Sequence, residues 1–326
     1  PATTRSSAEK PVSKLSEYST WLLGGLCSAV SAGFSVQIAH QIGAGEHKKA
    51  RDVLKHGIFT ALILSGILML GGIAISWQLP VWLGGEEILH RDASLYFLVY
   101  AATLPFTQLN WLASACLQCS GNMVTPSILN TVVCVLDAVF NALFIPRYGV
   151  LGAALGTGLA MGVVSLVMMW ACFLRSPELN LRRKEHCNLD KGILKRALRI
   201  GSPVGAEQIA MSGAMVVTTM IVAPLGTIAI AANSFAITAE SLCYMPGYGI
   251  GAAATTLVGQ SIGAGEHALA KKYGNLAIAL GCAIMTLMAV LMYFICPLVF
   301  QMLTPDLSVR ALGAEVLRIG LIEEPL

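Results

Sequence analysis

Long apolar stretches alternate with short polar segments along the whole chain. Nine stretches approach or exceed the roughly 20 residues that an α-helix needs to cross a hydrocarbon core of about 30 Å. This pattern predicts an all-α, polytopic membrane protein. The predicted spans cover residues 18–40, 57–80, 94–119, 127–146, 150–174, 199–224, 228–262, 274–300 and 309–326.

One hexapeptide occurs twice and predicts how the spans are organised. The sequence Ile-Gly-Ala-Gly-Glu-His fills residues 42–47 and returns at 262–267, 220 positions later, each time at the end of a long apolar stretch. Pro105 and Pro325 keep the same offset. A long internal repeat in a hydrophobic chain is typical of transporters built from two related helical bundles. We interpret the hexapeptide itself as a helix C-cap, with a glycine in the left-handed conformation.

The repeat also predicts the domain organisation. Six predicted spans, an even number, separate the two copies, so both face the same side of the membrane and the repeats are parallel. Aligning the halves predicts one span before residue 18 and further spans after residue 326. We therefore expect two lobes of six helices each, truncated here at both ends. The expected parts are a polar tail (1–17), an N-lobe with helices 2–6 (18–174), an inter-lobe loop (175–198) and an incomplete C-lobe with helices 7–10 (199–326).

Basic residues predict the orientation of the spans. Fourteen lysines and arginines lie in or beside three polar segments, 41–56, 175–199 and 263–273, which share one side if the spans alternate. The opposite loops hold only Arg91, Arg147 and Arg310. The positive-inside rule then places the Gly-Ala-Gly turns and loop 175–198 in the cytoplasm, with the protein in the cell (cytoplasmic or inner) membrane.

Composition narrows the functional classes. Apolar residues make up 56% and charged residues 12%, against about 25% charged in soluble domains. The net charge of +3 does not indicate nucleic acid binding, because the basic residues cluster at span ends. Eight of nine cysteines lie in apolar stretches, where cysteine packs as a small hydrophobe. The Cys116-x-x-Cys119 spacing lacks a redox-type strand and turn, and no histidine spacing suggests a metal. We expect no cofactor, no metal site and no enzymatic activity.

A polar stripe in the fourth predicted span is the first candidate site. Asp137 lies near the middle of the span, where a charge costs about 2.5–3.5 kcal/mol on insertion scales. Asn130, Cys134, Asp137 and Asn141 follow spacings of 4, 3 and 4 and share one helix face. Facing the interior of the bundle, this stripe could hold a proton or a cation. The alternative is a buried carboxyl group that only stabilises a neighbouring helix.

A second candidate lies in the seventh predicted span. Glu240, Tyr244 and Tyr248 are spaced by four and share one face, a combination suited to an organic cation through charge and ring-face attraction. Pro246 and the glycines that follow predict a bend or unwinding of the helix. The alternative is a packing bend with a hydrogen-bonded glutamate.

Two further acids complete the candidate set. Glu207 lies eight residues after Arg199, about 12 Å along the helix, and Glu324 precedes Pro325 in the last span. Either could line a cavity or serve only structure. If these acids share one cavity, a proton or sodium ion and a cationic substrate compete for the same negative charges, which is the physical basis of exchange.

Three segments resemble a known family. Residues 29–45, from Ala29 to the first Gly-Ala-Gly turn, resemble the second helix of multidrug and toxic compound extrusion (MATE) transporters, and residues 257–265 resemble the eighth. The run Phe144-Ile-Pro-Arg-Tyr-Gly-Val-Leu-Gly-Ala-Ala-Leu-Gly-Thr157 is similar to the connection between the fifth and sixth helices. The resemblance covers about residues 18–326.

The resemblance implies two six-helix lobes that export drugs and other amphipathic cations in exchange for H⁺ or Na⁺. Some members carry an Asn-x-x-x-Asp pair in the fifth helix, and the matching positions here hold Asp137 and Asn141 in the reverse order. Many members carry a seventh-helix glutamate where this chain has Met211, so Glu207 is the nearest substitute. The expected partners are the lipid bilayer and small cationic molecules, with the protein a monomer. The alternatives are a lipid-linked glycan flippase of the same superfamily and a truncated, non-transporting remnant.

Overall fold

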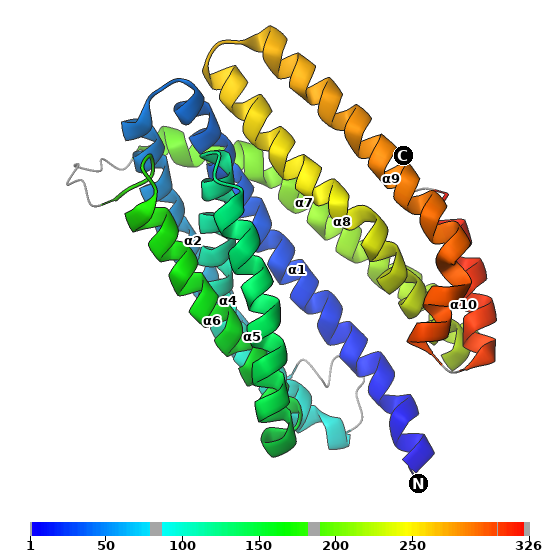
Figure 1. Ribbon diagram of the computed structural model, residues 1–326. Coiled ribbons are helices and arrows are strands. Elements are labelled where there is room, and N and C mark those ends of the chain that lie inside the picture. Colours follow the sequence, from blue (N-terminus) through cyan, green and yellow to red (C-terminus); the bar gives the residue numbers. More distant parts are fainter. Residues whose placement is uncertain (1, 79–86, 182–189, 305, 323–326) are drawn as a thin grey trace. The chain divides into compact units, whose positions relative to one another are not determined.

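The computed structural model describes residues 2–78, 87–181, 190–304 and 306–322, and helices account for nearly all of them (Figure 1). The all-α prediction is confirmed, and the described residues of each of the nine predicted spans lie mainly in one α-helix. The α-helices are α1 (Ala2–Gly43), α2 (His47–Ile75), α4 (Glu87–Cys119), α5 (Val124–Tyr148), α6 (Val150–Trp170), α7 (Lys191–Val222), α8 (Thr227–Gly263), α9 (His267–Leu303) and α10 (Leu307–Gly320). A π-helical turn, Ala171–Arg175, extends α6, and a short 3₁₀ turn, Ala223–Leu225, follows α7.

In the described part of the chain, six of these helices are long and apolar enough to cross a membrane: α2, α5, α6 with its π-helical turn, α7, α8 and α9. Their surfaces fit this assignment. On α2, for example, Leu62, Ile67 and Leu70 are exposed although they are large and apolar. Such side chains belong against lipid rather than water.

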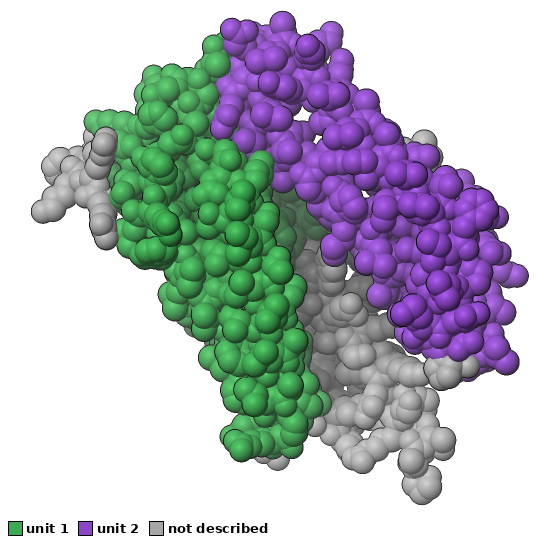
Figure 2. Space-filling view, in the orientation of Figure 1, with its two compact units in different colours: residues 1–212, 263–265 green, residues 213–262, 266–326 purple. Residues whose placement is uncertain are grey.

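The helices form two compact units (Figure 2): residues 1–212 with 263–265, and residues 213–262 with 266–326. In the first unit α4 packs against α1, α2 and α6, and α5 packs against α6. Phe34 and Ile38 of α1, Leu54 of α2 and Leu112 of α4 form the centre of its core. In the second unit, Cys243 of α8, Phe300 of α9 and Leu317 of α10 belong to one buried cluster.

Small residues bring α1 and the first half of α7 into backbone contact. A Cβ at Gly33 would lie 2.6 Å from the Ala197 carbonyl oxygen, and one at Gly201 would lie 2.8 Å from the Ala29 carbonyl oxygen. The residues recur every four positions on each helix, as in the small-residue stripes that join membrane helices. Gln37 adds a hydrogen bond across the pair, from Nε2 to the Ile193 carbonyl oxygen at 3.2 Å.

This contact explains where the units divide. The sequence predicts a lobe boundary in loop 175–198, with all of the next helix in the C-lobe. The compact units instead divide inside α7, at residue 212. Its first half belongs to unit 1 because of the backbone contact with α1.

The two Gly-Ala-Gly turns have the same conformation. Gly45 and Gly265 have φ angles of +74° and +79°. In the first turn the Glu46 N–H donates to the Gln41 carbonyl oxygen at 2.8 Å, and in the second the Glu266 N–H donates to that of Ser261 at 2.9 Å. These six-to-one bonds are the mark of a Schellman C-cap. The predicted helix C-cap is therefore confirmed in both copies.

Two expectations about local structure differ from the structure. Residues 2–17, predicted as a polar tail, are helical and continuous with the first span in α1. The predicted unwinding near Pro246 is wrong, since α8 is an unbroken helix from Thr227 to Gly263. A proline removes only one helical hydrogen bond, and the rest of α8 maintains the helix.

Candidate functional site

The α5–α6 hairpin forms the first candidate site. Gly149, with φ +56°, is the single residue between the two helices, a conformation that glycine adopts without strain. Gly152 of α6 faces the Phe144 carbonyl oxygen so closely that no Cβ would fit. Four residues later, a Cβ at Gly156 would lie 2.5 Å from Asn141 Oδ1. Because these two glycines, one turn apart, lack a Cβ atom, α6 can pack closely against the polar face of α5.

This close approach gives Asp137 a partner on α6. The Thr157 hydroxyl donates to Asp137 Oδ1 at 2.7 Å. Asn141 lies one turn further along the same face, and its Oδ1 atom is buried without a hydrogen-bond partner among the described residues. Asp137 and Asn141 are both half-buried. The hairpin therefore holds a carboxylate, a hydroxyl and an amide oxygen, the ligand types that hard cations prefer. The same carboxylate could instead carry a proton.

Asn130 does not belong to this group. It lies nearly two turns before Asp137 on α5 and is exposed, as is Cys134 between them. The predicted stripe is thus divided into an exposed first half and a half-buried second half that packs on α6.

In the second unit, Glu240 and the two tyrosines lie on α8. Glu240 is half-buried, and its carboxyl group lies against α10, where a Cβ at Gly320 would be 3.3 Å from Oε1. The rings of Tyr244 and Tyr248 meet edge to face, with centroids 5.8 Å apart. Tyr248 is 60% exposed. The acid thus packs on α10, while the outer ring of the pair remains open.

The other two predicted acids are not brought into either group. Glu207 is exposed on α7, and its neighbour Gln208 packs against α1 at Gly25. Glu324 lies outside the described residues.

Sequence reasoning missed a buried amide on α4. Gln108 is fully buried, and its Nε2 donates to the Cys27 carbonyl oxygen at 3.2 Å and to Ser31 Oγ at 3.4 Å, both on α1. Its Oε1 has no partner among the described residues. The signal was a glutamine in the middle of a predicted span, next to Thr107 and two positions before Asn110.

Sequence reasoning also missed a ring contact in the second unit. Arg318 of α10 lies over the Tyr293 ring of α9, with its Cζ atom 5.2 Å from the centroid. Its Nε atom is buried without a hydrogen-bond partner among the described residues. No sequence spacing links the two positions, because they come from different helices.

The chain resembles known proteins in both sequence and structure. The MatE family model matches residues 17–143 and 203–326. The chain is 29% identical over 274 residues to a probable multidrug resistance protein NorM of Thermotoga maritima, covering 78% of this chain and 56% of that protein. A probable multidrug resistance protein NorM of Neisseria meningitidis is 23% identical over 311 residues, covering 91% of this chain and 66% of that protein. The chain thus spans less than two thirds of the length of these relatives.

Solved structures share the fold. The crystal structure of a MATE protein in the straight conformation has a TM-score of 0.87 at 23% identity, over 98% of this chain and 72% of that one. A MOP superfamily transporter from Pyrococcus furiosus, described as having a binding pocket of reverse polarity, has a TM-score of 0.81 at 23% identity, over 94% of this chain and 70% of that one. At this level of identity the structures establish the helical architecture.

Proposed function

The chain belongs to the MatE family of multidrug and toxic compound extrusion transporters, and from this premise we propose that the complete protein exchanges H⁺ or Na⁺ for drugs and other amphipathic organic cations. The observation that carries the proposal is the carboxylate of Asp137 within a membrane span. Thr157 hydrogen-bonds it, and it lies one turn from the Asn141 oxygen, which has no hydrogen-bond partner in the described part of the chain. A carboxylate in a membrane span is costly, and the acids that such spans retain mark pathways for ions or protons.

We propose distinct roles for the candidate groups. Asp137 binds the coupling ion, while Asn141 and Thr157 supply neutral oxygens around it. Glu240 supplies negative charge, and the rings of Tyr244 and Tyr248 present aromatic faces to an organic cation.

The first experiment removes the charge of Asp137. The protein is reconstituted in liposomes, and efflux of a fluorescent organic cation is followed under an imposed pH gradient and, separately, an imposed sodium gradient. Asp137→Asn is expected to abolish efflux under whichever gradient drives the parent protein. Glu266→Gln is the matched control, because Glu266 lies in an exposed turn and makes no side-chain cap bond. Unchanged efflux by Asp137→Asn, at equal membrane insertion, would remove this residue from the ion site.

A second pair of variants tests the hydrogen bond to Asp137. Thr157→Val keeps the shape of the side chain but removes the hydroxyl, and Thr157→Ser keeps the hydroxyl. A hydrogen bond to a charged group is worth about 1.5–3 kcal/mol, so Thr157→Val is expected to shift the ion concentration for half-maximal efflux by about ten- to a hundredfold. Thr157→Ser should remain close to the parent protein. Equal behaviour of the two variants would show that the hydroxyl has no part in ion binding.

The sequence supports an orientation for the protein in the cell membrane. We propose that the Gly-Ala-Gly turns and loop 175–198 face the cytoplasm, because fourteen basic residues lie in or beside those segments. A cysteine introduced at exposed Lys48 should then react with an impermeant thiol reagent only from the cytoplasmic side.

A further inference from the structure

Three helices of unit 1 enclose an apolar groove of about 290 Å³. The side chains that line it are nearly all aliphatic, and Thr60 and Ser202 are the two hydroxyl residues among them. No described residue accepts a hydrogen bond from Thr60 or Ser202. The lining includes Leu26 and Phe34 of α1, Leu64 and Leu68 of α2, and Leu194 and Leu198 of α7.

The length of the groove matches one leaflet of a bilayer. Along α7 the lining runs from Leu194 to Gly205, a distance of about 16 Å at 1.5 Å per residue. Half of a hydrocarbon core of about 30 Å is about 15 Å. A single acyl chain that begins at the α7 N-terminus therefore has the reach to fill the groove.

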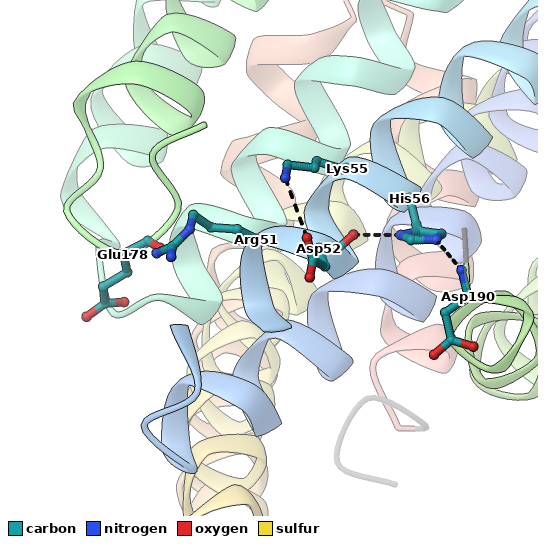
Figure 3. Close-up of polar contacts among 6 residues, drawn as sticks. All are labelled: Arg51, Asp52, Lys55, His56, Glu178 and Asp190. Carbon is teal, nitrogen blue, oxygen red and sulfur yellow. Dashed lines mark hydrogen bonds and ion pairs between the residues drawn. The ribbon is translucent and has the colours of Figure 1, made fainter. Parts of the chain in front are cut away.

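Hydrogen bonds from α2 fix the chain just before α7, next to the end of the groove at Leu194 (Figure 3). The backbone N–H of Asp190, just before α7, donates to His56 Nε2 at 3.0 Å, and His56 Nδ1 lies 2.7 Å from the Asp52 carbonyl oxygen. The imidazole of His56 therefore accepts at Nε2 and contacts the backbone of its own helix through Nδ1. Arg51 donates from Nη1 to the Glu178 carbonyl oxygen at 3.4 Å. The first turns of α2 therefore bind residues on both sides of segment 182–189.

Two lysines continue the lining face of α7 beyond the apolar part. Lys191 precedes Leu194 by three residues and Leu198 by seven, and Lys195 precedes Leu198 by three. Residues spaced by three, four or seven share one face of a helix. Both lysines are exposed and form no ion pair with a described residue. Arg199 follows Lys195 by four residues and lies beside it, whereas Arg196 lies on another face of the same turns.

We propose that this groove binds an anionic phospholipid, with one acyl chain between α1, α2 and α7 and the phosphate on Lys191 and Lys195. Zwitterionic lipids lack the net charge that two adjacent lysines select, whereas clustered basic residues beside membrane helices bind anionic headgroups. Thr60 follows His56 by one turn of α2 and lines the groove, so its hydroxyl can donate to an ester carbonyl of the lipid. The proposal concerns residues of unit 1 alone and is independent of transport.

The test measures lipid binding by the purified protein in detergent. Native mass spectrometry counts the retained lipids during titration with phosphatidylglycerol, with phosphatidylcholine of the same acyl chains, and with glycerol phosphate alone. The headgroup variant is Lys191→Gln with Lys195→Gln, and its control is Lys271→Gln with Lys272→Gln in α9. The groove variant is Leu198→Trp, where Leu198 is 64% exposed, and its control is Leu70→Trp on another face of α2, where Leu70 is 65% exposed.

The expected result is one phosphatidylglycerol per protein that phosphatidylcholine does not displace. At about 1 kcal/mol per lysine, the headgroup variant should bind it about 30-fold more weakly. Leu198→Trp should weaken lipid binding at least tenfold because the indole fills the groove, but it should bind glycerol phosphate as the parent protein does. Both control variants should bind the lipid with unchanged affinity. Circular dichroism and thermal unfolding without lipid verify folding. Equal retention of the two lipids would overturn the anionic assignment, and undiminished binding to Leu198→Trp would overturn the groove as the site.

Discussion

The contact between α1 and α7 gives a quantitative prediction for Gly33→Ala. The added methyl group would lie 2.6 Å from the Ala197 carbonyl oxygen, whereas ordinary contacts begin at 3.4 Å. Since the obstacle is backbone, α7 must move away by about 0.8 Å and lose packing along its length. Overpacking of this kind costs about 1–3 kcal/mol. Replacing glycine by alanine stabilises a helix by about 1 kcal/mol. The net loss in the free energy of unfolding is therefore about 0–2 kcal/mol.

The control for this prediction is Gly24→Ala on the same helix. No atom lies within 4 Å of a Cβ at Gly24, so this variant gains helix propensity without strain. The two variants should then differ by the full strain of about 1–3 kcal/mol. At about 2–4 °C per kcal/mol for a unit of roughly 200 residues, Gly33→Ala should unfold about 2–12 °C below Gly24→Ala.

Native cysteines provide the assay. Cys27, Cys116 and Cys172 are buried as free thiols in unit 1, so a dye that fluoresces on reaction with thiols reports unfolding without a label. Gly201→Ala should behave like Gly33→Ala, and the double variant should cost less than the sum, because one displacement of α7 relieves both contacts. A melting temperature for Gly33→Ala at or above that of Gly24→Ala would refute the reasoning.

Two further predictions concern glycines whose role the structure defines. Gly45→Ala should destabilise the protein by about 1–2 kcal/mol because φ is +74° at this position, and Gly265→Ala should do so equally because the second turn repeats the conformation. Gly66→Ala, which meets no atom within 4 Å, should be neutral or stabilising in the same thermal assay, and unequal effects at the two turns would contradict their equivalence. Gly313→Ala should lower the stability of unit 2 by about 1–3 kcal/mol, since its Cβ would overlap the fully buried ring of Phe300. Cooperative unfolding of Gly313→Ala at the parent temperature would show that the ring moves freely.

The local features follow from sequence because their causes are local. Apolar length predicted each α-helix in the described part of the chain, since a backbone in lipid must satisfy its own hydrogen bonds. The hexapeptide predicted the conformation of both turns, since only glycine adopts a positive φ without strain. The acid of the α5 stripe, Asp137, was also visible, because a carboxylate in the middle of an apolar stretch stands out whatever its partners are.

The partners of these residues were decided by the tertiary structure. Thr157 meets Asp137 because Gly152 and Gly156 let two helices approach, and no spacing in the sequence connects them. Arg51 was counted among the cytoplasmic charges, yet it is buried and donates to the Glu178 carbonyl oxygen. Side-chain partners across helices depend on the rotation and separation of the helices.

Sequence alone thus determined that this chain is a duplicated, helical membrane protein with a few costly acids, because hydropathy and backbone conformation act over a turn or a span. Tertiary structure decided that Asp137 faces α6 while Asn130 does not, and that α7 belongs in part to the first compact unit. These outcomes depend on steric fit between distant segments, where the absence of a single Cβ at Gly33 or Gly156 sets the distance between two backbones.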